Sequence, residues 1–188
     1  MKTIKLKISL IIIALLLWQC NNSVEYASKT ILAKAPFFEL TSVRGDILNS
    51  NDYKGKFVVL HIATTWCPYC NAEAPHLQEI YETYKSKNVE VLIIDVKEPK
   101  ELVEKKLVEN FNLEFPVLLD TNGSVAASFA PENILPELAR DEIMLASNLL
   151  IDAEGNIQFM SLLDTKNFDV ELKELTQKLD ELLSNSTN

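Results

Sequence analysis

The segment that most restricts the fold of this chain is an apolar run, KFVVLHIA at residues 56–63, which is followed four residues later by a cysteine. An uninterrupted run of this length, rich in β-branched side chains, is typical of a strand that is buried on both faces of a sheet. A second such run, VEVLIIDV, occupies residues 89–96 after a stretch with helical spacing. Buried strands that alternate with helices predict an α/β fold, in which helices cover both faces of one mixed sheet.

The remaining segments add to this sheet, and the length of 188 residues suits one domain with one core. The predicted order is β-α-β-α-β-β-α, preceded by a β-hairpin. The expected elements are a hairpin at 36–50, strands at 56–63, 89–96 and 148–152, a short extended piece at 115–120, a hairpin partner at 157–163, and helices from residue 67 or 68, around 102–111 and at 170–183.

The N-terminus has the pattern of an export signal. Three lysines precede residues 8–18, which are apolar except for Ser9. This run is shorter than the roughly 20 residues that span a bilayer, and it has the size of a signal-peptide core. It ends at Cys20 in LLLWQC, which resembles a bacterial lipoprotein signal whose cysteine is lipidated. Trp18 and Gln19 depart from the small residues usual there, so an uncleaved anchor and a simple export signal remain alternatives.

These features predict three parts: a lipoprotein-type signal peptide at 1–20, a flexible tether at 21–35, and a domain at 36–185. We expect a protein of the bacterial cell envelope, anchored to a membrane by lipid on Cys20 and facing the periplasm. The whole chain has 18 basic and 27 acidic residues, a net charge of −9. Removing Lys2, Lys5 and Lys7 with the signal gives 15 − 27 = −12. Such an acidic domain repels phosphate backbones, so nucleic acid is not an expected partner.

Cys67 and Cys70 form a C-x-x-C pair, for which three interpretations compete. A structural disulfide closing so short a loop constrains little of the unfolded chain and stabilises poorly. A zinc site needs about four ligands, and His61 and His76 do not complete a known zinc spacing. The third interpretation, a redox dithiol at the start of a helix after a buried strand, is favoured.

A helix that begins here gives the two sulfurs different chemistry. At the N-cap, the Cys67 sulfur faces unpaired backbone N–H groups and the positive end of the helix dipole, which stabilise a thiolate. Pro68 suits the first helical turn because it has no N–H to leave unsatisfied. Cys70, one turn further on, should be more buried and less acidic. Cys67 is therefore the expected attacking thiol, and Cys70 the thiol that resolves the mixed disulfide.

The sequence WCPYCNAEAP resembles the TlpA/ResA-like branch of the thioredoxin superfamily, with its AhpC/TSA-type redoxin domain. Its members carry W-C-x-x-C followed by E-x-P, here Trp66, Cys67, Cys70, Glu73 and Pro75. The segments DYKGKFVVL, FPVLLD and LLIDAEGNI extend the likeness over most of residues 34–183. The resemblance implies a thioredoxin-like fold with an added N-terminal β-hairpin.

The resemblance also implies an activity. Its members are exported, membrane-tethered thiol-disulfide oxidoreductases that pass electrons to disulfides in client proteins, including cytochrome c precursors. The implied partners are such clients and a thiol electron donor in the membrane or envelope. The resemblance implies a redox disulfide between Cys67 and Cys70, and neither a cofactor nor a metal is expected.

Two residues depart from the family pattern. Where relatives have a cis-proline before the late strand, alignment on Ile151 and Asp152 places Ala146. A cis peptide before a residue other than proline costs roughly 2.5–4 kcal/mol, so either the client groove differs, the site admits a metal, or a trans peptide takes this place. His61 stands where relatives often bury an Asp or Asn beneath the resolving cysteine. It either accepts the Cys70 proton or is a core histidine bonded to backbone.

The residues around the sulfurs also have two possible roles. Trp66 and Tyr69 either border the sulfur and contact clients or simply pack. Glu73 is interpreted as an acid favoured by the helix dipole. Two other functions remain open: a copper-binding module, since soft thiolates suit copper(I), and a peroxidase. Thr64 gives the T-x-x-C spacing of peroxiredoxins, but their upstream proline would fall at Leu60.

Overall fold

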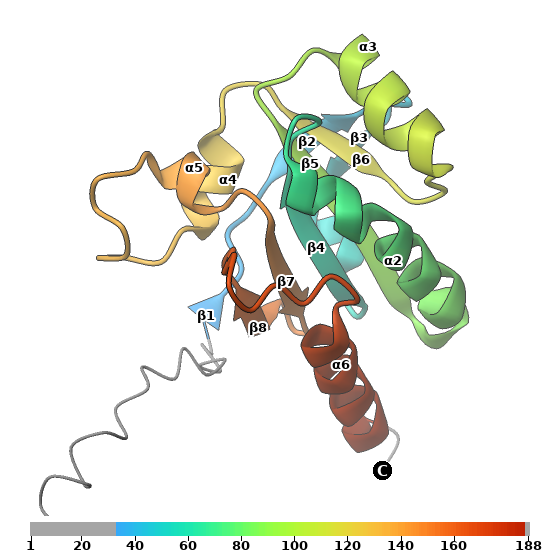
Figure 1. Ribbon diagram of the computed structural model, residues 1–188. Helices are drawn as coiled ribbons and strands as arrows, with labels where there is room; N and C mark the ends of the chain where they lie inside the picture. The colour runs from blue at the N-terminus through green and yellow to red at the C-terminus, as the bar shows by residue number, and fades with distance from the viewer. Residues whose placement is uncertain (1–32, 187–188) are drawn as a thin grey trace, which may run out of the picture.

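The computed structural model describes residues 33–186, and its centre is an eight-stranded mixed sheet (Figure 1). The strand order is β1-β8-β7-β4-β5-β6-β2-β3. The central strands β4 (Phe57–Ala63) and β5 (Val89–Val96) pair in parallel from Phe57↔Val89 to Ala63↔Asp95. Every residue of β4 is buried, as its unbroken apolar run predicted.

The strands on either side of this pair explain how distant segments reach the centre. On one side, β7 (Ser147–Ile151) pairs antiparallel with β4, and β8 (Asn156–Ser161) continues the hairpin. On the other, β6 (Val117–Asp120) lies parallel to β5. The predicted order omitted β6 from the sheet, although it carries the hairpin of β2 (Glu39–Ser42) and β3 (Ile47–Asn49) through its antiparallel pairing with β2.

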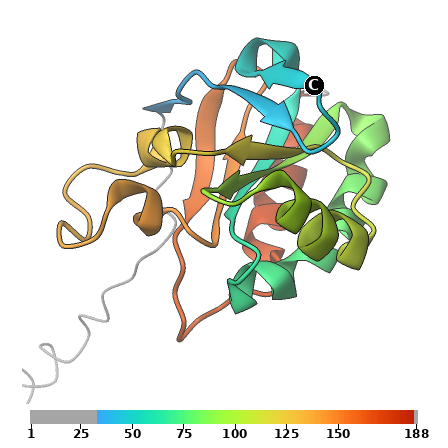
Figure 2. The ribbon, with the colours of Figure 1, turned by 90° about the horizontal axis from the view of Figure 1, so that it is seen from above.

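Helices cover both faces of the sheet, as the sequence predicted. One face carries α2 (Pro68–Tyr84), α3 (Lys100–Val103) with the π-helical segment η3 (Glu104–Glu109), and α6 (Lys173–Ser186). The other carries α4 (Ser124–Phe129) and α5 (Arg140–Ile143), two short helices in a region without clear periodicity (Figures 1 and 2). Short 3-10 turns, η1 (Ser50–Tyr53) and η2 (Lys85–Lys87), complete the elements.

The last helix shows what holds these layers together. Leu175 and Leu179 of α6 are buried in the same apolar cluster as the strand residue Leu150. Burying one leucine contributes about 1.5–3 kcal/mol. The exposed pair Lys178–Glu181 on the same helix contributes only about 0.2–0.5 kcal/mol. Apolar burial therefore docks α6, and its charged face is a solvated surface.

The expected signal peptide, Cys20 and most of the tether lie outside the described residues. The first described strand, β1 (Ala33–Lys34), falls within the range expected to be tether, and it pairs with Ile157 and Asn156 of β8. From residue 33 to residue 186, no helix is both long and apolar enough to cross a membrane.

Candidate functional site

The two cysteines lie at the N-terminus of α2, directly after the loop that leaves β4. Cys67 is the N-cap, with extended backbone angles of φ −76° and ψ 114°, and Pro68 is the first helical residue. The backbone N–H of Cys70 donates to the Cys67 sulfur, with the nitrogen 3.2 Å from Sγ. The predicted start of the helix and its cap are thus both present.

This position separates the acidities of the two thiols. A hydrogen bond from the Cys70 side chain lowers the pKa of Cys67 to about 6, with help from the backbone N–H groups of Cys70 and Tyr69 and against the effect of burial. The same hydrogen bond, together with burial, raises the pKa of Cys70 above its ordinary value. At neutral pH, Cys67 is therefore a thiolate, and Cys70 remains a protonated thiol.

Both cysteines are almost completely buried, although they lie at the N-terminal end of a helix. Cys67 is 4% exposed and Cys70 is 1% exposed, and both belong to the apolar cluster that contains Ala146. Trp66, by contrast, is 67% exposed beside them. The fold therefore covers both cysteines and leaves the neighbouring indole exposed.

Tyr69, in the middle of the cysteine motif, is partly buried. Its ring meets Phe168 edge to face, with centroids 4.9 Å apart and an interplanar angle of 76°. Phe168 comes from the loop between β8 and α6, about a hundred residues further along the chain. This contact brings the late loop against the first turn of α2, a neighbour that sequence spacing did not indicate.

Beneath the cysteines, three polar side chains form a buried chain that we call the floor cluster: His61 of β4, Asn148 of β7 and Glu73 of α2. His61 Nδ1 lies 2.9 Å from Asn148 Oδ1, and Asn148 Nδ2 donates to Glu73 Oε1 at 2.8 Å. The second Glu73 oxygen, Oε2, is 3.6 Å from His61 Nδ1. All three residues are at most 2% exposed.

Burial dominates the ionisation of this cluster. It lowers the pKa of His61 to about 4, although hydrogen bonds from the ring to Asn148 and to the Ser147 backbone favour the charged form. It raises the pKa of Glu73 to about 8, where the nearby Cys67 and Asp169 charges add to the rise and the Asn148 hydrogen bond opposes it. His61 is therefore neutral at pH 7, while Glu73 can gain or lose a proton near neutrality.

Ala146 lies immediately before β7. It is buried, its N–H donates to Ile62 O at 2.8 Å, and its φ is +59°. A left-handed conformation costs an alanine roughly 1–2 kcal/mol. Residues 33–186 contain no cis peptide bond. The peptide bond at this position is therefore trans, and the alanine is left-handed.

Glu98, which is partly buried, holds the loop just before the cysteines, and Asp95 is buried beside it; we call Thr65, Asp95 and Glu98 the loop anchor. Glu98 accepts from the Thr65 backbone N–H and, at 2.7 Å, from its hydroxyl. Asp95 is 1% exposed, and neither of its oxygens has a hydrogen-bond partner within the described chain. Burial first, and then the Glu98 charge, raise the pKa of Asp95 to about 9.

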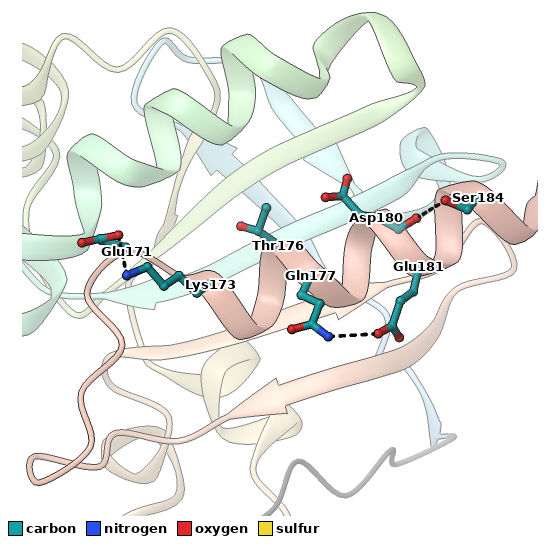
Figure 3. A pocket seen from close by; sticks show the side chains of 7 residues that line it. All are labelled: Glu171, Lys173, Thr176, Gln177, Asp180, Glu181 and Ser184. Carbon is teal, nitrogen blue, oxygen red and sulfur yellow. Dashed lines mark hydrogen bonds and ion pairs between the residues drawn. The ribbon is translucent and has the colours of Figure 1, made fainter.

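A hollow in the surface lies away from the cysteines. It measures about 580 Å³ and runs along the outside of α6, between side chains such as Lys173, Gln177 and Asp180 (Figure 3). These groups are occupied with one another or with neighbours: Lys173 pairs with Glu171, and Asp180 accepts from Tyr84. No thiol lines it, so it is not a candidate site. Nor do the described residues include a group of three or more His, Cys, Asp or Glu side chains that could hold a metal ion.

Three residues of the site were missed or undervalued at the sequence level. Glu73 was seen only as an acid near a helix start, although it lies three residues after Cys70 and hence on the same helix face. Asn148 and Glu98 carried no local signal. They reach the site because β7 pairs with β4, placing Asn148 opposite His61, and because β5 ends beside β4.

Comparison with known proteins adds to this geometry. Residues 31–160 match the model of the AhpC/TSA family. The chain is 35% identical over 138 residues to the thiol-disulfide oxidoreductase ResA of Geobacillus kaustophilus, covering 73% of this chain and 72% of that protein.

Solved structures agree with the fold. One is a Bacteroides thetaiotaomicron protein named provisionally as a protein disulfide isomerase, with a TM-score of 0.69, 26% identity, and coverage of 85% of this chain and 92% of that one. Another is the thioredoxin domain of a Bacteroides vulgatus thiol-disulfide oxidoreductase, with a TM-score of 0.62, 22% identity, and coverage of 80% and 98%.

Proposed function

Because this chain belongs to the AhpC/TSA family and is a thiol-disulfide oxidoreductase of the ResA type, we propose that it is exported and reduces disulfides in client proteins through Cys67 and Cys70. The observation that carries the proposal is the opposite ionisation of the two thiols. The pKa of Cys67 is lowered to about 6 at the helix terminus, while that of Cys70 is raised. An attacking thiol must be ionised at ambient pH, and a resolving thiol must wait until the first has reacted.

The reaction proceeds in two exchanges. The Cys67 thiolate attacks one sulfur of a client disulfide, the other client sulfur leaves as a thiolate, and a mixed disulfide forms. Cys70 then loses its proton, and its thiolate attacks the Cys67 sulfur and releases the second client sulfur. The client gains two electrons and two thiols, and the protein loses two electrons and holds a Cys67–Cys70 disulfide. A thiol donor in the envelope returns the protein to the dithiol form.

Glu73 is the group best placed to take the proton from Cys70. Its carboxyl group is buried beneath the pair, and its charge raises the pKa of Cys70. Its own pKa, about 8, lies close to ambient pH, which favours exchange in both directions. His61 is unsuited to this task through Nδ1, which faces the Asn148 oxygen. In this scheme Trp66 and Tyr69 border the approach to the sulfur, and Pro68 fixes the first turn.

The cellular location rests on the N-terminal sequence. The basic start, the short apolar run and Cys20 support export, lipid attachment and a tether up to residue 35. A Cys20→Ala variant expressed in a bacterial host should no longer incorporate labelled fatty acid and should leave the membrane fraction. Unchanged membrane retention would contradict lipid anchoring.

Client trapping tests the proposed activity. Cys70→Ser should accumulate mixed disulfides through Cys67 in the cell envelope, and these should disappear on addition of a reductant. Cys67→Ser with Cys70 intact is the matched control and should trap far less. Equal trapping by both variants, or by neither, would contradict the assigned roles. A reduction potential near that of the strong oxidants, about −120 mV, would contradict the direction of electron flow.

A further inference from the structure

We propose that Asn148 is a positioning residue, which links a neutral His61 to Glu73 and controls the ionisation of the Glu73 carboxyl beneath the cysteine pair. Its consequence for turnover rests on the proposed dithiol function. Its physical content, the effect of one buried amide on one buried carboxyl group, can be measured without any client.

The geometry fixes which way the amide points. Asn148 Nδ2 donates to Glu73 Oε1, so its Oδ1 is the atom that faces His61 Nδ1, at 2.9 Å. An amide oxygen only accepts, so His61 must carry its proton on Nδ1. His61 Nε2 then has no proton, and it has no hydrogen-bond partner within the described residues. The histidine thus acts as a fixed donor that holds the amide in one orientation.

This orientation matters because the reverse would oppose ionisation. A flipped amide would place its oxygen against Glu73 Oε1, and two acceptors would face each other unless the carboxyl group were protonated. The amide N–H in its present place stabilises the carboxylate instead. Asn148 can supply this bond only because β7 pairs antiparallel with β4 and sets Asn148 opposite His61.

The other charged or titratable groups that face Glu73 either favour its protonation or stay neutral. They are His61 from β4, Cys67 and Cys70 from the N-terminus of α2, and Asp169 from the loop before α6. Burial and the charges of Cys67 and Asp169 raise the pKa of Glu73, and Asn148 opposes them with its hydrogen bond. Without that bond, Glu73 should remain protonated to higher pH and should accept the Cys70 proton less readily.

The direct test is an NMR titration of the Glu73 side-chain carboxyl carbon, identified by its loss in Glu73→Gln. Asn148→Leu keeps a similar volume but removes the donor, and it should move the titration midpoint upward by about one pH unit or more, as expected for loss of a hydrogen bond to a charged group. Asn156→Leu is the matched control, because it removes an asparagine whose amide bonds to Asp152 instead. The proposal would be overturned if the midpoint in Asn148→Leu lay within about 0.3 pH units of the midpoint in the unsubstituted protein. That difference is only about twofold in the ionisation constant.

A second measurement uses the unsubstituted protein and so does not depend on the folding of any variant at this position. The side-chain amide resonances of Asn148 should titrate with the same midpoint as the Glu73 carboxyl carbon. Amide resonances that stay constant while Glu73 titrates would overturn the proposal.

The kinetic consequence separates a positioning role from simple packing. The pH profile of the resolving step should shift upward in Asn148→Leu, and in a Glu73→Gln background the same substitution should produce no further shift. An equal slowing at every pH, or a shift that persists without Glu73, would contradict the proposal. If the titrations behave as expected but Cys70→Ser traps no client, the proposed function fails and the amide–carboxyl link stands. If Cys70→Ser traps clients but the titrations do not behave as expected, the proposed function stands and the amide–carboxyl link fails.

Discussion

The floor cluster and the loop anchor each contain a buried carboxyl group close to the cysteine motif, yet the two are built differently. Glu73 receives a hydrogen bond from Asn148, and its pKa is raised to about 8. Asp95 receives none within the described chain, lies beside the Glu98 carboxylate, and has its pKa raised to about 9. The comparison shows two opposite surroundings: at Asp95 the neighbouring Glu98 adds to the effect of burial, whereas at Glu73 the hydrogen bond from Asn148 opposes burial and favours the charged form.

The largest expected effect concerns Asp95, the buried carboxyl group that receives no hydrogen bond within the described chain. The folded-state pKa of Asp95, about 9, lies above its ordinary value of 3.8. Its contribution to stability is therefore fully present below pH 3.8 and is lost as the pH rises towards 9. Asp95→Asn removes this loss, so the variant should gain stability relative to the unsubstituted protein at up to about 1.4 kcal/mol per pH unit between these limits. Urea unfolding at pH 5, 7 and 9 measures it, and parallel stability curves would contradict the assignment.

The next effect tests the side with the donor. Glu73→Gln keeps the shape of the side chain but removes the proposed proton acceptor, so the resolving step should slow by about 100-fold at pH 7. Single-turnover release of a model client from the Cys67 mixed disulfide measures this rate. Asp95→Asn is the control and should leave the rate within about threefold, because Asp95 belongs to the other cluster. Comparable slowing by both variants would remove the functional distinction between the two acids.

A smaller effect concerns what the loop anchor does. Glu98→Ala removes the acceptor of both Thr65 hydrogen bonds, so we expect it to lower the free energy of unfolding by about 1–3 kcal/mol. Without the Glu98 charge, the pKa of Asp95 should also fall. Chemical denaturation reports the stability and carboxyl-carbon NMR reports the pKa. Full stability in Glu98→Ala would show that the anchor contributes little to the loop.

The smallest effect lies outside both clusters and serves as their reference. Phe168→Leu removes the edge-to-face contact with Tyr69 but keeps an apolar side chain, so the loss of stability should be only about 0.5–1.5 kcal/mol. The pH profile of exchange should not move, since the contact between these two rings involves no residue of the floor cluster. A shifted profile would indicate that the late loop, through its neighbour Asp169, also controls Glu73.

The features that could be predicted from the sequence are those that depend on neighbours along the chain. The unbroken apolar runs indicated β4 and β5, and the position of Pro68 after Cys67 indicated where α2 begins. The acidity of Cys67 follows from the same local geometry, because its sulfur is capped by groups of the next turn. The position of Glu73 near the cysteines could also have been predicted, because Glu73 shares a helix face with Cys70.

The floor cluster depended on strand pairing. His61 and Asn148 are separated by 87 residues, and nothing in either local sequence states that they meet. The antiparallel register of β4 and β7 sets them opposite each other, and α2 then places Glu73 against both. The burial of Cys67 and the backbone of Ala146 were decided in the same way, by packing around them.

The sequence by itself determined the central strands, the start of α2 and the place of the two cysteines in its first turn, because periodicity, β-branching and helix capping act over a few residues. Only the tertiary structure decided which buried groups surround those sulfurs and how they ionise. A pKa in the interior depends on distance and on the loss of water, and both are set by residues that are brought together from distant parts of the chain.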